Sequence, residues 1–74
     1  MLKEYFVLIK KVEGEEVYVS KNAPDEVVLD LSDALSFFSL NHISIWRKCN
    51  PNVIGTIAAK VQVKGVHINV TKIE

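Results

Sequence analysis

The sequence predicts an α+β domain, in which two β-hairpins form a mostly antiparallel sheet of four to five strands and one short helix packs on one face. Val and Ile, with eleven and seven copies against six Leu, favour sheet over helix because they are β-branched. Two pairs of apolar segments are each joined by a short glycine-containing turn, which is typical of hairpins. One central segment carries helix start and stop signals, and a helix on one face of an antiparallel sheet defines the α+β class.

The length and the net charge of the chain predict a single folded domain. We expect one domain, residues 1–74, because a chain of 74 residues is too short to fill a second core. Nine basic and nine acidic residues cancel while 49% of the chain is apolar, which predicts a folded chain without the positive field that attracts nucleic acids. No N-terminal apolar stretch reaches the length of a signal peptide or membrane span, and the single Cys49 excludes an internal disulfide. A cytoplasmic setting is therefore expected.

The first hairpin is predicted from the apolar pattern on either side of Gly14. Residues 5–9 are apolar on both faces, which indicates a central strand, and residues 17–19 resume the pattern after the Glu13-Gly14-Glu15 break. The register stays open, since two- and three-residue loops pair different side chains. After a turn at residues 21–25, alternating Val27, Leu29 and Leu31 predict a short third strand.

The middle of the chain allows two interpretations. Ser32 is a candidate N-cap for one or two helical turns, so residues 32–40 are either helix or loop. A clearer helix start is Asn41 as N-cap, with Leu40 and Ile45 placed as a hydrophobic staple.

The end of this helix is predicted from its last turn. Arg47 and Lys48 suit the negative end of the helix dipole, and Pro51 follows as a stop. Ile43, Trp46 and Cys49 would form its apolar stripe. Alternation over residues 43–49 also fits a strand, but the agreement of cap, staple, cations and stop favours the helix.

The last hairpin has the clearest pattern. Apolar residues alternate along 57–63 and again along 66–70. With Lys64-Gly65 as a two-residue turn, Val63 would face Val66, and Gln62 would face His67. One face of this hairpin would then point to the core and the other to water.

The candidate chemistry is sparse. His42, His67 and Cys49 have spacings that match no compact metal-ligand pattern, so we expect solvated histidines and a small buried packing cysteine. The carboxylates lie in turns and at strand or helix ends, and the three glycines are isolated, so no acid–base pair and no phosphate-binding loop is indicated. The sequence therefore predicts no enzyme, no metal and no cofactor.

The aromatic residues are the best candidates for a contact surface. Phe37 and Phe38 are adjacent and must point apart in any regular structure, so one of them is a candidate for exposure. The alternative is that so short a chain needs every large side chain in its core. The candidate partner-binding residues are Phe37, Phe38 and Trp46, and secondly Gln62 and His67 on the polar face of the last hairpin.

Three short segments carry a resemblance. VYVS at Val17 to Ser20, LDLSDALSF at Leu29 to Phe37 and WRKCNP at Trp46 to Pro51 resemble small proteins encoded by bacteriophages and other mobile elements. The resemblance implies a small non-enzymatic protein that acts by contacting a host protein.

Two functions follow as expectations. The first is a non-catalytic protein-binding module, a phage-type modulator or inhibitor of a host protein that also self-associates as a homo-oligomer; no membrane partner is expected. The second is a small nucleic-acid-binding protein that uses the C-terminal hairpin.

Overall fold

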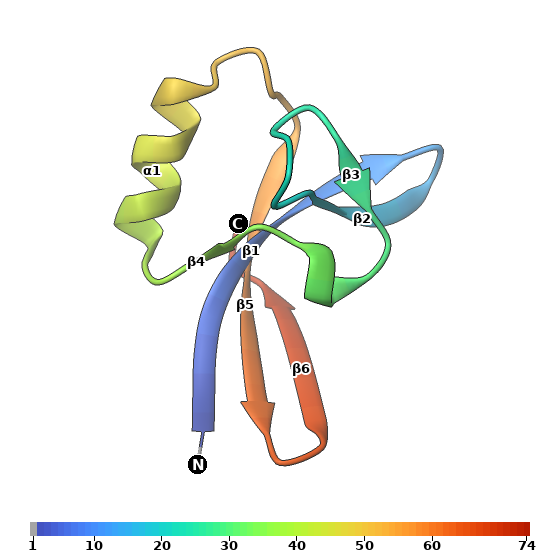
Figure 1. Ribbon diagram of the computed structural model, residues 1–74, viewed down its shortest axis with the longest axis vertical. Helices are drawn as coiled ribbons and strands as arrows, with labels where there is room; N and C mark the ends of the chain where they lie inside the picture. Colours follow the sequence, from blue (N-terminus) through green and yellow to red (C-terminus); the bar gives the residue numbers. More distant parts are fainter. Residues whose placement is uncertain (1) are drawn as a thin grey trace.

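The computed structural model describes residues 2–74 and places all of its strands in one antiparallel sheet with a single α-helix (Figure 1). The elements are β1 (Leu2–Val12), β2 (Glu15–Val19), β3 (Val27–Val28), a 3-10 turn (Leu31–Asp33), β4 (Ser36–Phe37), α1 (Leu40–Cys49), β5 (Thr56–Lys64) and β6 (His67–Lys72). The α+β class and the two hairpins are confirmed. The described part of the sheet has six strands where four to five were predicted, because the two-residue strand β4 pairs with β1 in addition to the predicted strands.

Strand β1 is the centre of the sheet, whose order is β3-β2-β1-β5-β6. One edge of β1 pairs with β5 from Leu2↔Lys64 to Lys10↔Thr56. Its other edge pairs with β2 near the end of β1 and with β4 at Phe6 and Val7. Both faces are also covered, since Val7, Leu8 and Ile9 are all buried. The predicted central strand is thereby confirmed.

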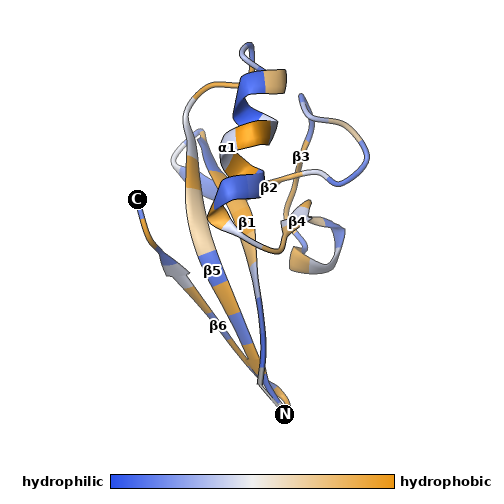
Figure 2. Cartoon of the chain, turned by 90° about the vertical axis from the view of Figure 1, so that its left-hand side faces the viewer, coloured by the Kyte–Doolittle hydropathy of each residue, from blue (hydrophilic) through white to orange (hydrophobic). Residues whose placement is uncertain are grey.

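Alternation along β1 divides the core into two clusters. The helix-side cluster contains Leu8, Val19, Phe37, Ile43 and Ala58, and α1 lies over it. The opposite cluster contains Val7, Ile9, Ala34, Ala59 and Val61. The distal part of the β5–β6 hairpin and the start of β1 extend beyond the helix (Figures 1 and 2). The prediction that one whole face of this hairpin points to water is therefore wrong at Ala58, which is buried beneath the helix.

The two hairpin turns follow the positions of their glycines. Glu13 and Gly14 both have positive φ, 52° and 84°, as a two-residue type I′ turn requires, and Val12 pairs with Glu15. In the second hairpin the turn is Gly65-Val66, so Val63 pairs with Ile68 and Gln62 with Asn69. The predicted Lys64-Gly65 turn is therefore wrong: the turn lies one residue later, and the strand register shifts by two. Gly65 takes the positive φ that the first position of this turn demands. A shift of two keeps every side chain on its predicted face.

The helix begins two residues earlier than predicted. Ser39 is its N-cap, and the Ser39 hydroxyl accepts a hydrogen bond from the His42 backbone N–H at 3.3 Å. Leu40 therefore lies inside the first turn, and the Asn41 cap with its hydrophobic staple is wrong. Arg47 and Lys48 occupy the last turn as expected.

Residues 32–40, for which the sequence allows helix or loop, contain neither a continuous helix nor a long strand. Asp30 caps the 3-10 turn by accepting from the Ser32 N–H at 3.0 Å, so Ser32 is not the cap. Leu35 then donates its N–H to the Val19 carbonyl of β2 at 2.9 Å, and the next two residues form β4, which pairs with Phe6 and Val7 of β1. The third strand is shorter than predicted, since it comprises only Val27–Val28.

Leu8→Ala tests the helix-side core. Leu8 is 0% exposed, so we expect the free energy of unfolding to fall by about 2–5 kcal/mol from lost burial and the residual cavity. Leu29→Ala is the matched control, because its exposed side chain should change stability by roughly 0.5 kcal/mol or less. Urea denaturation followed by circular dichroism measures both, and equal losses in the two variants would contradict this description of the core.

Candidate functional site

The two adjacent phenylalanines have opposite environments. Phe37 is buried in the helix-side core, where its ring meets Trp46 edge-on at a centroid distance of 6.1 Å. Phe38 is 88% exposed, and its ring lies edge-on to His42 with centroids 6.5 Å apart. Phe37 is thus a core residue in this fold and cannot offer a contact to a partner, whereas Phe38 can.

Trp46 contributes to the core and to a surface niche. It is half-buried and packs against the helix-side cluster. Its outer part lines a niche of about 270 Å³ together with Leu35, Asn50 and residues 20–24. Cys49 is exposed, so the predicted buried packing role of Cys49 is wrong. The next residue, Asn50, is the C-cap of the helix, and its side chain donates a hydrogen bond to the Trp46 carbonyl at 2.9 Å.

Gln62 and His67 lie on the polar face of the β5–β6 hairpin, as expected from the alternation. Gln62 Nε2 donates to Glu4 Oε2 at 3.0 Å, and Lys60 Nζ lies 3.8 Å from the same oxygen. His67 is exposed and pairs with Lys64 beside the turn. The Glu4 carboxylate therefore offsets part of the positive charge on this face.

A groove lies between α1, the start of β5 and the residues that follow β6. Its volume is about 550 Å³. Ile43 and Ala58 form its floor and are buried, while Leu40 and Ile73 form apolar walls that are 51% and 40% exposed. The remaining lining residues are polar or charged: Ser44, Arg47, Lys48 and Glu74.

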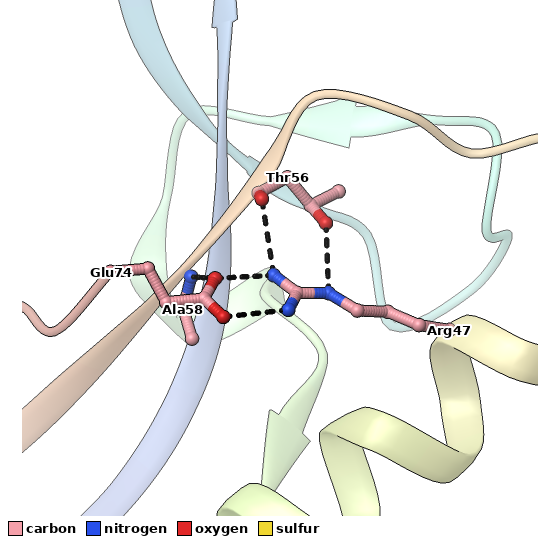
Figure 3. A network of polar contacts seen from close by, with 4 residues as sticks. All are labelled: Arg47, Thr56, Ala58 and Glu74. Carbon is pink, nitrogen blue, oxygen red and sulfur yellow. Dashed lines mark hydrogen bonds and ion pairs between the residues drawn. The ribbon is translucent and has the colours of Figure 1, made fainter.

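Arg47 organises one end of this groove (Figure 3). Its guanidinium forms two hydrogen bonds with the Glu74 carboxylate, of 2.7 Å and 2.5 Å. The same group donates to the Thr56 hydroxyl at 3.3 Å and to the Thr56 carbonyl at 3.1 Å. A planar guanidinium suits this bidentate arrangement, which a lysine could not reproduce. Arg47 thereby joins the end of the helix to the first residue of β5.

Glu74 accepts a hydrogen bond from the backbone of β5 in addition to its ion pair with Arg47. The Ile73 N–H donates to the Ala58 carbonyl at 3.0 Å, so the residues after β6 continue its ladder with β5. The Ala58 N–H donates to Glu74 Oε1 at 2.8 Å. The hydrogen bonds from Arg47 and Ala58 lower the pKa of Glu74 to about 2, and the hydrogen bond to Glu74 raises the pKa of Arg47. Both groups are therefore charged and mutually satisfied at neutral pH.

The lowered pKa of Glu74 bears on whether this carboxylate can transfer a proton. A general acid needs a carboxyl group whose pKa lies close to the working pH, whereas Glu74 is held ionised. Among residues 2–74, no group of three or more His, Cys, Asp and Glu side chains is placed to hold a metal ion. The groove combines an apolar floor and apolar walls with the fixed charges of Arg47 and Glu74.

The sequence contains no local signal for this groove. Arg47 and Glu74 are 27 residues apart, and neither a motif nor a periodic pattern connects them. The apolar residues Leu40 and Ile73 belong to separate elements, and only the packing of α1 beside β5 brings them to the same groove.

No protein-family model matches this sequence, and neither a curated protein nor a solved structure matches it at a significant level. Within the described residues, no helix has the length and apolar character needed to cross a membrane.

Acid should weaken the Arg47–Glu74 connection in a defined pH range. The folded-state pKa of Glu74, about 2, lies below the ordinary value of 4.5, so its contribution to stability is complete above pH 4.5 and is lost as the pH falls toward 2. Because both side chains are about one-third exposed or more, we expect only about 1 kcal/mol in total. Glu74→Gln should reduce the loss of stability across this range.

Arg47→Gln is the partner variant, and the double variant should lose little more than either single one because the two groups act together. The pH series is measured by urea denaturation, and an NMR titration of the Glu74 carboxyl carbon gives its midpoint. A midpoint near 4.5, or strictly additive losses in the two variants, would contradict the interaction.

Proposed function

We propose that this chain is a non-catalytic protein-binding module that contacts its partner through the α1–β5 groove and the neighbouring Phe38. The observation that carries the proposal is the exposure of large apolar side chains in and beside one groove: Leu40 and Ile73 line it, while Phe38 lies two residues before Leu40 and borders a separate hollow with Tyr5 and Leu31. Phe38 and Leu40 are exposed at the start of α1, and Leu40 and Ile73 line the groove above buried Ile43.

The exposed apolar side chains at this end of the helix lie close together in the chain or line the same groove. Single exposed apolar residues are common on soluble proteins, whereas apolar groups gathered around a concave surface are typical of contact sites. Covering one such side chain contributes roughly 1.5–3 kcal/mol to association. The Arg47–Glu74 pair and Lys48 supply the polar border that usually surrounds such a contact.

The chemistry of the groove favours an amphipathic segment as its occupant. Leu40 and Ile73 would pack against apolar side chains of that segment. Lys48, for which no ion pair is found among residues 2–74, lines the same groove and could pair with an acidic side chain. The resemblance to small mobile-element proteins supports a partner from the host and a role as its modulator or inhibitor.

Self-association is part of the same proposal. The chain has nine basic and nine acidic residues, and a surface without net charge offers little repulsion between copies. Exposed apolar residues also occur outside the groove, notably at the tip of the β5–β6 hairpin. Two copies can therefore meet without covering the groove.

The alternative function is nucleic-acid binding by the polar face of the β5–β6 hairpin. Lys60, Lys64 and His67 share that face, which supports it, but Glu4 lies on the same face and pairs with Lys60. Phosphate contacts would make the affinity fall steeply with salt. We expect fluorescence anisotropy with a labelled oligonucleotide to show no binding at low ionic strength, and salt-sensitive binding there would favour the alternative.

A variant comparison tests the proposed function directly. Phe38→Ser combined with Leu40→Ser removes apolar contact area without touching a buried residue. The matched control is Leu29→Ser, because Leu29 is also a large exposed side chain, at 76%, but lies outside the groove. Each immobilised protein is presented to a bacterial lysate, and the captured proteins are quantified by mass spectrometry.

We expect a captured partner that is retained by Leu29→Ser and reduced by about tenfold or more in the double variant, the loss that one or two buried apolar side chains produce. Circular dichroism should show that all three proteins are folded. If every captured protein is retained equally by the double variant, binding through this groove is contradicted.

A further inference from the structure

The outer edge of β6 is open. In the described sheet β6 pairs only with β5, so its second edge has no neighbouring strand. The residues that follow do not cover this edge, because Ile73 and Glu74 turn toward Ala58 and Arg47 on the side of β5. An unpaired strand edge is a template for the addition of another strand.

The hydrogen bond of Ile73 shows which backbone groups this edge presents. The Ile73 N–H donates to the Ala58 carbonyl, and the Ala58 N–H points to the same side and donates to Glu74 Oε1, so 58–73 is a hydrogen-bonded position of the antiparallel ladder. Such pairs alternate with non-hydrogen-bonded pairs, and the observed register continues through Thr71 and Asn69. The N–H and carbonyl groups of Ile68, Val70 and Lys72 therefore point away from β5, toward the open edge.

The side chains of β6 are suited to pairing with themselves. Ile68 and Val70 lie on one face, and Ile68 is 60% exposed. The strand contains no proline, and its one lysine, Lys72, is held across the sheet in an ion pair with Glu16. Proline and free lysine are the usual means of protecting an edge, and neither is available here.

We propose that β6 pairs antiparallel with β6 of a second copy, and that this joins the two sheets into one. The proposal rests on the self-association proposed above and assigns it to one surface. In the favoured register Ile68 faces Val70 of the second copy, and Val70 faces Ile68. Asn69 then faces Asn69 of the second copy on the two-fold axis, and His67 faces Thr71.

Side-chain complementarity selects this register. Centring the pair on Val70 instead would set Ile68 against Lys72 and disturb the ion pair with Glu16. Centring it on Ile68 would require residues of the turn at Gly65-Val66 to act as strand. The favoured register pairs apolar with apolar residues, opposes no two like charges, and matches the outward backbone groups of Ile68 and Val70 in hydrogen-bonded pairs.

Cysteine cross-linking tests the register in the full chain, with the exposed Cys49 first replaced by Ser. In the proposed dimer Asn69 and its copy form a non-hydrogen-bonded pair, whose Cα atoms lie about 4.5 Å apart, within the span of a disulfide of roughly 4.4–6.8 Å. Asn69→Cys should therefore form a covalent dimer under mild oxidation. The control is Thr71→Cys, because its thiol would lie about four residues, roughly 13 Å, from its copy.

Sedimentation velocity over a concentration series measures association independently of oxidation. We expect a reversible dimer for the wild type and a weaker one for Asn69→Lys, which sets two like charges opposite each other at an exposed position. A monomer at all concentrations would overturn both this proposal and self-association. A dimer that cross-links equally through both cysteines, or that Asn69→Lys leaves unchanged, would overturn the β6 pairing alone.

A different occupant of the edge would also be visible. NMR shifts of the β6 amides that appear only when another protein is added to a wild-type monomer would assign the edge to that protein and overturn pairing with a second copy. Groove variants such as Leu40→Ser should leave the dimer unchanged, so failure of the groove proposal and failure of the β6 proposal are distinguishable.

Discussion

The burial of β1 on both faces is the constraint on which the rest of the structure depends. Val7, Leu8 and Ile9 are consecutive, so their side chains alternate between the two faces, and all three are buried. One layer of structure cannot cover both faces. The chain therefore needs α1 over Leu8 and the Leu31–Ala34 segment over Val7 and Ile9. The pairing of β1 with strands on both edges follows from the same central position.

The groove is a consequence of how the helix is attached. Ile43 packs on Ala58 with the small side chain of alanine between helix and sheet, while Arg47 joins the end of α1 to Thr56 and Glu74. These two contacts hold α1 beside the start of β5 and leave the space between Leu40 and Ile73 open. The Arg47 interaction is thus important for the shape of the groove, although its exposed charges contribute little to stability.

The end of β6 separates the two surfaces to which we assign binding. Ile73 and Glu74 turn inward to complete the ladder at Ala58 and the ion pair at Arg47. This inward turn forms one wall of the groove and leaves the outer edge of β6 uncovered. A partner in the groove and a second copy along β6 would consequently occupy opposite sides of the same terminal segment. In the proposed dimer each copy would then keep its own groove accessible.

The sequence by itself determined the α+β class, the two hairpins, the central position of β1 and the last turn of the helix, because periodicity, glycine turns and helix-end cations act within a few residues. It also determined that Phe37 and Phe38 point apart. Only the tertiary structure decided that Phe37 is the buried one, since this depends on Trp46 and the pairing of β4 with β1. The helix start at Leu40, by contrast, follows from a local interaction, the Ser39 cap, that the assignment of Asn41 as N-cap missed. The groove and the Arg47–Glu74 pair were beyond local patterns, as their residues are distant along the chain and meet only when the helix packs on the sheet.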